Sequence, residues 1–474
     1  MGVHSSESHL RIHRYQYEVF AALAATTQKG AVSYYNDSLY EHGIEITAYY
    51  LKDGENKGYY FSFELHYDQL LRTGDRVTLP TVEELSLLRQ RFIEVLTNTD
   101  IAIILLFPFG EPFDFSKLGE IWDTMHTDRV DYVQLTGLPE AERRAYARAL
   151  NQGRWGDLST YLPKNKDIVP PKTFETSCYL EQRVRTKDGN GELRLRINFY
   201  DKNHCFIDTQ HRRAHPITSE ELERSTGVFR IEVQVFKPVV EYLSSADGKD
   251  LNISGRYLPE LLTAQMSHYF IAKYLIQLGG TGDYYKRSTA KKKIQQNKIL
   301  RLHQTTKDGI CNMLDAIDKA YQNNADMLNL DEVLKSLNLP YKTKRNYLMT
   351  LEKLNINPIP LPNNSPFNQL PNLWERVKEQ FPQMTAGLPI AKRRIYTDFY
   401  GVKASPYGME MPERYRETKA NINALAKLVQ LKPYRIYWLP AADTNIHAYK
   451  WYEDIDEYQW RQEHRNELLT SHSV

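Results

Sequence analysis

The stretch ELRLRINFYDK at residues 192–202 decides how this chain is best interpreted. Apolar and polar residues alternate strictly along it, which is typical of a β-strand with one buried face and one exposed face. The exposed face carries, in order, Arg194, Arg196, Asn198, Tyr200 and Lys202. A tyrosine hydroxyl beside positive charge suits contact with a phosphodiester, or attack on one. Because the chain contains 33 tyrosines, an ordinary surface tyrosine is the alternative interpretation.

The composition is that of a folded protein with more than one domain. The chain has 474 residues, enough for roughly two to four domains with real cores. Hydrophobic residues make up 41% and charged residues 25%, as in ordinary globular proteins. The net charge is only +2, so a DNA-binding surface requires local clustering of positive charge. Three cysteines without metal-type spacing favour a reducing compartment and no disulfide framework.

The sequence shows neither a membrane-spanning segment nor a signal peptide. Its longest apolar run, residues 101–109, is about half as long as a spanning helix must be. Residues 1–13 are polar and contain three histidines, without the apolar core of a signal peptide. Histidines bind metals, but a frayed terminus is the preferred interpretation of this segment. We therefore expect a protein of the host cytoplasm that does not engage a membrane.

Strands and helices are mixed in the first half of the chain. Two hairpins are predicted, one from 44–51 and 58–65, the other from 174–184 and 193–202, each with glycine in its turn. Further strands are predicted at 101–107, 129–135 and 227–236, and helices at 14–30, 82–95 and 139–150. The frequent hairpins predict an α+β fold, in which a largely antiparallel sheet is covered by helices on one face.

The second half of the chain is predicted to be mainly helical. An amphipathic helix at 258–278 is followed by a basic run at 284–298, and then by a helix–turn–helix pattern at 330–354. Residues 358–372 contain five prolines and four asparagines, which predicts a linker or an extended arm. A basic run either binds phosphates or forms a solvated helix face. Together with two arginines of the first stretch, the predicted DNA-binding residues are Arg194, Arg196, Lys291, Lys292, Lys293, Lys342, Lys344 and Arg345.

Three acidic residues share one property with Tyr200. Glu64, Asp131 and Glu232 each lie on the polar face of a strand whose other face is apolar. If these strands belong to one sheet, the three carboxylates converge, and hard cations such as Mg²⁺ and Mn²⁺ prefer oxygen ligands of this kind. A bound cation would polarise a phosphodiester. The alternative is cross-strand ion pairing with arginines such as Arg129 and Arg230.

Other catalytic patterns are missing from the sequence. It contains no Walker-type glycine-rich loop, no Gly-x-Ser-x-Gly and no His-Glu-x-x-His.

Four stretches together resemble the filamentous-phage gene II replication initiators. More loosely, they are similar to the trans-acting rolling-circle initiators of plasmids and to the nicking relaxases of conjugative elements. The stretches are YYFSFELHYDQLL at 59–71, DRVDYVQL at 128–135, LRINFYDKNH at 195–204 and GVFRIEVQVF at 227–236. Their order and rough spacing agree with that family, and LPYKTKRNYLMTLEKLNI at 339–356 is similar to its helix-turn-helix-like segment. The sequence departs from the better-known nicking enzymes because it lacks a His-hydrophobic-His pair.

The resemblance implies a role for individual residues. Tyr200 would be the nucleophile and Lys202 would lie close to the scissile phosphate. Asp131, Glu232 and Glu64 would bind Mg²⁺ or Mn²⁺. Origin DNA, both double- and single-stranded, would be the partner, with host helicase and polymerase acting after it; a homo-oligomer is left open.

The same resemblance implies a division of the chain. Residues 1–43 would be an N-terminal helical segment and residues 44–245 a nicking and joining catalytic domain. Residues 246–357 would be a helical, helix-turn-helix-like DNA-binding region. Residues 358–474 would be a linker and a C-terminal region to which the sequence assigns no role.

Three functions are compatible with the sequence. The first is a metal-dependent endonuclease that nicks and rejoins one DNA strand at a rolling-circle origin, through a 5′-phosphotyrosine and a free 3′-hydroxyl. The second is a sequence-specific DNA-binding protein without catalysis, which reads DNA through residues 284–354. The third is a structural protein of a mobile element, in which the acids are merely ion-paired. A metal-dependent covalent complex with DNA separates the first from the other two.

Overall fold

The structure, a computed structural model, describes most of the chain up to residue 380. Within residues 2–380 it leaves out 24–25, 29–30, 35, 52–56, 82, 107–112, 155–157, 162–176, 186–190, 210–216, 244–252, 254 and 324–327. Beyond residue 380 it describes only 439–440 and 449–450, so most of the predicted C-terminal region lies outside the described residues. The chain divides into two compact units: unit 1 is Met1–Tyr274 with Glu375–Leu388, and unit 2 is Leu275–Trp374 with Pro389–Val474.

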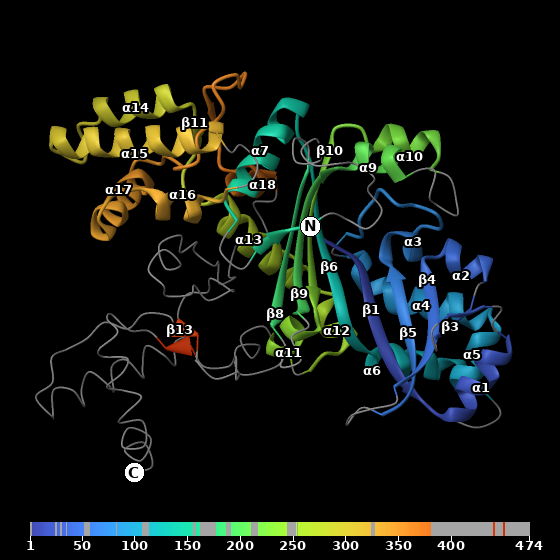
Figure 1. The fold of residues 1–474 in the computed structure, drawn as a ribbon. Coiled ribbons are helices and arrows are strands. Elements are labelled where there is room, and N and C mark those ends of the chain that lie inside the picture. The colour runs from blue at the N-terminus through green and yellow to red at the C-terminus, as the bar shows by residue number, and fades with distance from the viewer. Residues whose placement is uncertain are drawn as a thin grey trace, which may run out of the picture. The chain divides into compact units, whose positions relative to one another are not determined.

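Unit 1 is built on a ten-stranded antiparallel sheet (Figure 1). Its strand order is β2-β3-β4-β5-β1-β6-β10-β9-β8-β7. The strands are β1 Gly2–Ile12, β2 Thr26–Gln28, β3 Ala31–Tyr34, β4 Ile44–Leu51, β5 Gly58–His66, β6 His126–Gly137, β7 Leu158–Thr160, β8 Cys178–Arg185, β9 Gly191–Asp201 and β10 Val228–Phe236. The two predicted hairpins, β4–β5 and β8–β9, are both present.

Helices pack against the apolar face of this sheet. Phe61 and Phe63 of β5 are fully buried and contact Phe20 of α1 (Arg14–Leu23) and Phe92 of α4 (Leu88–Thr97). Farther along the sheet, Tyr132 of β6 stacks on Phe270 of α13 (Ala264–Gly279). The alternation of apolar and polar residues in each strand thus produces the predicted α+β fold with an antiparallel sheet and helices.

The other helices of unit 1 connect the strands or flank them. They are α2 Asp37–Glu41, α3 Tyr67–Leu71, α5 Asp100–Leu106, α6 Leu118–Thr124, α7 Glu140–Gln152, α9 Lys202–Thr209, α10 Ser219–Arg224, α11 Lys237–Leu243 and α12 Leu258–Leu261.

The prediction of a strand at 101–107 is wrong, because this segment forms α5. Five of its seven residues are buried, so the helix is apolar on nearly all sides. A short run that is apolar throughout has no periodicity that separates a buried strand from a buried helix.

The predictions of a frayed N-terminus and of a helical segment over residues 1–43 are also wrong. Residues 2–12 form β1, which lies in the middle of the sheet and pairs with β5 on one side and with β6 on the other. In the middle of β1, its buried face carries Ser6 and Ser8 instead of large apolar residues. Ser6 is hydrogen-bonded to the hydroxyl of Tyr67, and Ser8 lies 3.3 Å from the hydroxyl oxygen of Thr127. Serines at buried positions hide the alternation of apolar and polar residues that predicts a strand.

Unit 2 contains four whole helices and two pairs of short strands among its described residues, and β13 Leu439–Pro440 with β14 Tyr449–Lys450 is one of these pairs. The helices are α14 Arg287–Gln296, α15 Gln304–Asn323, α16 Leu330–Ser336 and α17 Tyr341–Lys353, and the strands β11 Tyr284–Tyr285 and β12 Gln369–Leu370 pair with each other. The predicted helix–turn–helix corresponds to α16 and α17. The segment 358–372 is not a linker, because Ile359, Leu361 and Leu370 are buried and Asn372 donates hydrogen bonds to carbonyls at residues 279–282.

Two further findings concern the described residues. The three cysteines are free thiols. No helix in the part of the chain that the structure describes is long and apolar enough to span a membrane.

Candidate functional site

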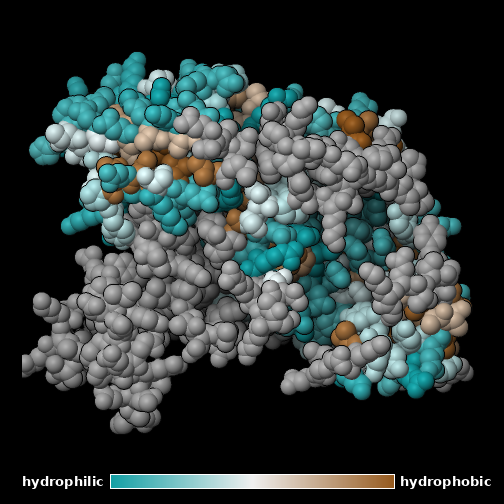
Figure 2. All heavy atoms as spheres, in the orientation of Figure 1, coloured by the Kyte–Doolittle hydropathy of each residue, from teal (hydrophilic) through white to brown (hydrophobic). Residues whose placement is uncertain are grey.

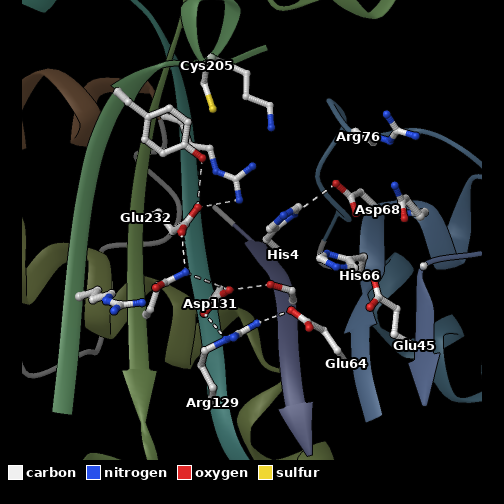
Figure 3. A pocket seen from close by; sticks show the side chains of 18 of the residues that line it. His4, Glu45, Glu64, His66, Asp68, Arg76, Arg129, Asp131, Cys205 and Glu232 are labelled. Carbon is white, nitrogen blue, oxygen red and sulfur yellow. Dashed lines mark hydrogen bonds and ion pairs between the residues drawn. The ribbon is translucent and has the colours of Figure 1, made fainter. Parts of the chain in front are cut away.

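The polar face of the unit 1 sheet holds a cavity of about 550 Å³. Side chains from six neighbouring strands, β4, β5, β1, β6, β10 and β9, line it together with residues from α3 and α9 (Figure 3). Figure 2 shows hydrophilic residues around the hollowed centre of this face. Most of the lining is polar or charged, with histidines, carboxylates, arginines, a lysine and Tyr200.

The register of the strands brings these side chains together. Ser5 of β1 lies opposite His66 of β5 on one side and opposite Asp131 of β6 on the other. Asp131 in turn lies opposite Gln234 of β10. Because directly opposed residues of antiparallel strands point to the same side of a sheet, this row forms one continuous polar surface.

One group of side chains in the cavity has the composition of a metal site. His4, His66 and Asp68 each offer a ligand atom, and these atoms lie within 4.8 Å of one another. His4 Nδ1 is buried and lies 3.1 Å from Asp68 Oδ2. We call these three residues the histidine cluster; Figure 3 shows His4 facing His66 and Asp68.

A β-bulge places His4 in this cluster. The pairing of β1 with β6 shifts between Val3 and Ser5, so His4 is an extra residue in its strand. His4 and Ser5 both line the cavity as a result, although neighbours in a regular strand point to opposite faces. His66 ends β5 and Asp68 lies in the first turn of α3, so a short strand-to-helix corner supplies the other two ligands.

The protonation states in the histidine cluster suit a divalent cation. Burial and the charge of Arg230 lower the pKa of His4 to about 4, so its imidazole is neutral at pH 7. Burial raises the pKa of Asp68, but His4, which also hydrogen-bonds to it, and then His66 and Lys202 outweigh this effect and lower the pKa to about 2. Neutral imidazole and ionised carboxylate are the forms that bind metals. Two imidazoles and one carboxylate suit Mn²⁺ better than Mg²⁺, which prefers oxygen ligands.

The three acids predicted as metal ligands line the same cavity, but each contacts an arginine. Arg129 Nη2 is 2.7 Å from Glu64 Oε1, and Arg129 Nε is 3.4 Å from Asp131 Oδ1. Arg230 Nη2 is 2.8 Å from Glu232 Oε2. We call Glu64, Asp131 and Glu232 the acid cluster. Its ion pairs are those that the alternative interpretation expected, and a guanidinium already provides the positive charge that a metal ion would bring.

Tyr200 points at the acid cluster. Its hydroxyl donates a hydrogen bond of 3.3 Å to Glu232 Oε2, the same oxygen that Arg230 contacts. The amides of Asn198 and Gln234 hold the other oxygen of Glu232, at 3.1 and 2.8 Å. The side chain is only 9% exposed, not on an open surface as predicted. Burial, together with the charge of Glu232, raises the pKa of Tyr200 well above its usual value, so the hydroxyl is protonated at neutral pH.

The other residues of the first stretch are divided between two places. Lys202 and Arg196 line the cavity, with Lys202 only 6% exposed and Arg196 lying 4.7 Å over the ring of Tyr161. Arg194 does not line it, although its alternation with Arg196 predicted the same face. The register between β8 and β9 shifts at Arg194, which is buried at this bulge.

Sequence reasoning thus found six of the lining residues and missed the histidine cluster. Tyr200, Lys202, Arg196, Glu64, Asp131 and Glu232 all reach the cavity. A signal for His66 was present, because it lies two residues after Glu64 on the same strand face. No pattern in the sequence signalled His4, since the bulge that re-aims it comes from the pairing with β6.

The six predicted DNA-binding residues of unit 2 are divided equally between internal contacts and the surface. Lys291 donates to Asp315 and Lys293 to the hydroxyl of Tyr285, both at 2.7 Å. Lys344 is buried and donates to the carbonyl of Leu334 at 2.7 Å. The remaining three are at least partly exposed: Lys292, Lys342 and Arg345.

Comparisons with known proteins give one weak similarity. No protein-family model matches the chain, and no curated protein matches it. Among solved structures, the chain is similar to a rolling-circle replication initiator protein from Geobacillus stearothermophilus, with 13% identity and a TM-score of 0.19. The match covers 49% of this chain and 73% of that one.

Proposed function

We propose that this chain is a metal-dependent DNA strand-nicking and joining enzyme that initiates rolling-circle replication, with Tyr200 as its nucleophile. One observation carries the proposal: the hydroxyl of Tyr200 and the histidine cluster line the same charged cavity of about 550 Å³. A phosphodiester in this cavity would meet a nucleophile, a candidate cation site and the cations Lys202 and Arg230.

The reaction follows from the position of Tyr200. A bond forms between Tyr200 Oη and the phosphorus, and the bond from phosphorus to the 3′-oxygen breaks. The departing oxygen takes its electron pair and a proton from solvent, which leaves a free 3′-hydroxyl and a 5′-phosphotyrosine. The phenol proton has an acceptor in Glu232 Oε2, 3.3 Å from the hydroxyl. The reverse reaction rejoins the strand, because the phosphotyrosine link conserves the bond that was cut.

The tyrosine needs help to react at neutral pH, because burial keeps it protonated. The positive charge of Arg230 opposes this effect and favours the phenolate. A divalent cation in the histidine cluster would supply further charge to polarise the phosphate. We propose His4, His66 and Asp68 as the main ligands; that Glu64, Asp131 and Glu232 bind metal stays a prediction.

A covalent adduct tests the proposal. Supercoiled DNA of the chain's own replicon is incubated with the protein and Mn²⁺ or Mg²⁺. We expect nicked circles that carry protein, and peptide mapping should find the nucleotide on Tyr200. EDTA should abolish both products. Full nicking in EDTA, or nicking without an adduct, would contradict the proposal.

The second candidate function, DNA binding without catalysis, is favoured by the charge of unit 2. Residues 275–374 contain 14 lysines and arginines against 8 aspartates and glutamates, a net charge of +6 in a chain of net +2. We propose that this region contributes to origin binding through Lys292, Lys342 and Arg345. Their replacement by alanine should weaken binding and reduce its dependence on salt, because phosphate contacts release counterions. Sequence-specific binding by a wild-type protein that forms no adduct would favour this second function.

A further inference from the structure

One buried arginine of the cavity has capacity for another partner. Arg230 of β10 is 2% exposed and lines the cavity. Its Nη2 contacts Glu232 Oε2 at 2.8 Å, whereas its buried Nε has no hydrogen-bond partner among the described residues. A guanidinium has five N–H donors, and an unpaired buried donor is costly. The hydrogen-bond donors of Arg230 are therefore only partly used by the described protein groups.

Arg230 is also aligned with the nucleophile. It lies directly opposite Tyr200 in the pairing of β10 with β9. Its guanidinium carbon is 5.8 Å from the centre of the Tyr200 ring, and the Tyr200 hydroxyl and Arg230 share Glu232 Oε2 as a partner. A group that reacts with the Tyr200 hydroxyl must therefore come close to this guanidinium.

Two other arginines that line the cavity, Arg129 and Arg196, also contact carboxylates. Arg129 is surrounded by three carboxylates, Glu7, Glu64 and Asp131, at 2.7 to 3.4 Å. Arg196 pairs with Glu181 at 3.4 Å and lies over the ring of Tyr161. An anionic ligand would find less uncompensated positive charge at Arg129 than at Arg230. Arg196 lies opposite Gln234 in the pairing of β10 with β9, not opposite the partner of Tyr200.

We infer that Arg230 is a catalytic residue, which binds a non-bridging oxygen of the scissile phosphate while Tyr200 attacks the phosphorus. The inference rests on the proposed function and adds to it the group that holds the reacting phosphate. A planar guanidinium donates two parallel N–H bonds to phosphate oxygens, which fixes the orientation as well as the charge. Glu232 then holds both the nucleophile and the phosphate-binding residue in place.

The test pairs a change in the enzyme with a change in the substrate. The wild-type protein first identifies the phosphate that it cuts in a single-stranded oligonucleotide. A second oligonucleotide carries a neutral methylphosphonate at that position. Adduct formation is measured for both substrates with the wild type, Arg230→Ala, Arg230→Lys and the exposed control Arg144→Ala, whose guanidinium contacts only Glu140 among the interactions that the structure gives it.

We expect Arg230→Ala to lower kcat/KM on the natural substrate by about 100-fold, as loss of one preorganised donor does. The methylphosphonate should slow the wild type and Arg144→Ala strongly but slow Arg230→Ala little, because the interacting pair is already broken. Ethylguanidinium in solution should partly restore Arg230→Ala and should not restore Tyr200→Phe.

Two results would overturn the inference, and they have different consequences for the proposed function. If the enzyme and substrate changes are simply additive, Arg230 does not contact the phosphate, although the proposed function stands. If the wild type forms no adduct, the proposed function fails and the inference fails with it. Should Arg230→Ala lose its fold by circular dichroism, Arg230→Lys takes its place in the comparison. It keeps the charge beside Glu232 but loses the two parallel N–H donors, so the methylphosphonate should slow it less than it slows the wild type.

Discussion

The histidine cluster and the acid cluster line the same cavity, but they differ in how their carboxylates are paired. In the histidine cluster, three ligand atoms lie within 4.8 Å of one another, and His4 Nδ1 lies 3.1 Å from Asp68 Oδ2. In the acid cluster, Arg129 and Arg230 lie 2.7 to 3.4 Å from the carboxylates. Figure 3 shows both groups in one view. The comparison teaches that the number of carboxylates does not identify a cation site, because neighbouring guanidinium groups decide whether charge is left to bind a metal.

The largest expected effect is that of Tyr200→Phe, which should abolish catalysis and leave both clusters unchanged. The adduct and the nicked product should disappear, whereas Mn²⁺ binding should not change. Because Tyr200 is buried and donates to Glu232, the free energy of unfolding should fall by about 1 kcal/mol, measured by urea denaturation. An adduct formed by Tyr200→Phe would show that another residue is the nucleophile, with Tyr179, whose ring lies 6.1 Å away, as the next candidate.

The next largest effect should show which of the two clusters binds the metal ion. Asp68→Asn should weaken Mn²⁺ binding by about 100-fold or more, since a ligand is lost and even residues behind the ligands contribute roughly 10–100-fold. Glu64→Gln, its matched control in the acid cluster, should change the affinity less than about 3-fold. Calorimetric titration with Mn²⁺ measures both. The reverse order of effects would move the metal to the acid cluster, as the sequence predicted.

Removal of Arg129 should create a cation site at Glu7 and two residues of the acid cluster, Glu64 and Asp131. In Arg129→Met, the carboxylates of Glu7, Glu64 and Asp131 lose their shared partner. The metal-free variant should be destabilised by about 2 kcal/mol, less than for a fully buried pair because the arginine is 19% exposed. Added Mn²⁺ should restore this stability by binding at a second position. Thermal denaturation with and without Mn²⁺ tests this, and equal metal responses in variant and wild type would refute it.

The smallest effect concerns Glu232, which belongs to the acid cluster but contacts the nucleophile. Glu232→Gln keeps a hydrogen-bond acceptor for Tyr200 and removes the negative charge. Nicking should slow by roughly 10-fold, in the range for loss of a proton acceptor, while Mn²⁺ affinity stays the same. A large loss of Mn²⁺ affinity would instead make Glu232 a metal ligand.

Residues with a strict two-residue alternation were predictable from the sequence. The strands at 58–66, 126–137, 191–201 and 228–236 were recognised because each has one apolar face, and that pattern also fixed which side Glu64, Asp131, Tyr200 and Glu232 point to. The same pattern failed for β1, whose buried face carries the hydrogen-bonded Ser6 and Ser8, and for α5, which is apolar on nearly all sides. The alternation of apolar and polar residues predicts a buried strand face only where apolar side chains form that face.

The sequence by itself determined the α+β class, the polar face and the presence of Tyr200 and three carboxylates on it. Only the tertiary structure decided which charges are balanced and which are not. The bulge at His4 depends on the pairing of β1 with β6, where Ser5 and Asp131 are 126 residues apart in sequence. The corner at His66 to Asp68 is held beside β1, where Ser6 and Tyr67 are 61 residues apart. The ion pairs of Arg129 and Arg230 likewise depend on register, which places each guanidinium within 3.4 Å of its carboxylate. The alternation along a strand determines which face of the sheet a side chain lies on. The register between strands determines which charged group it contacts. That contact determines whether an acid can bind a metal.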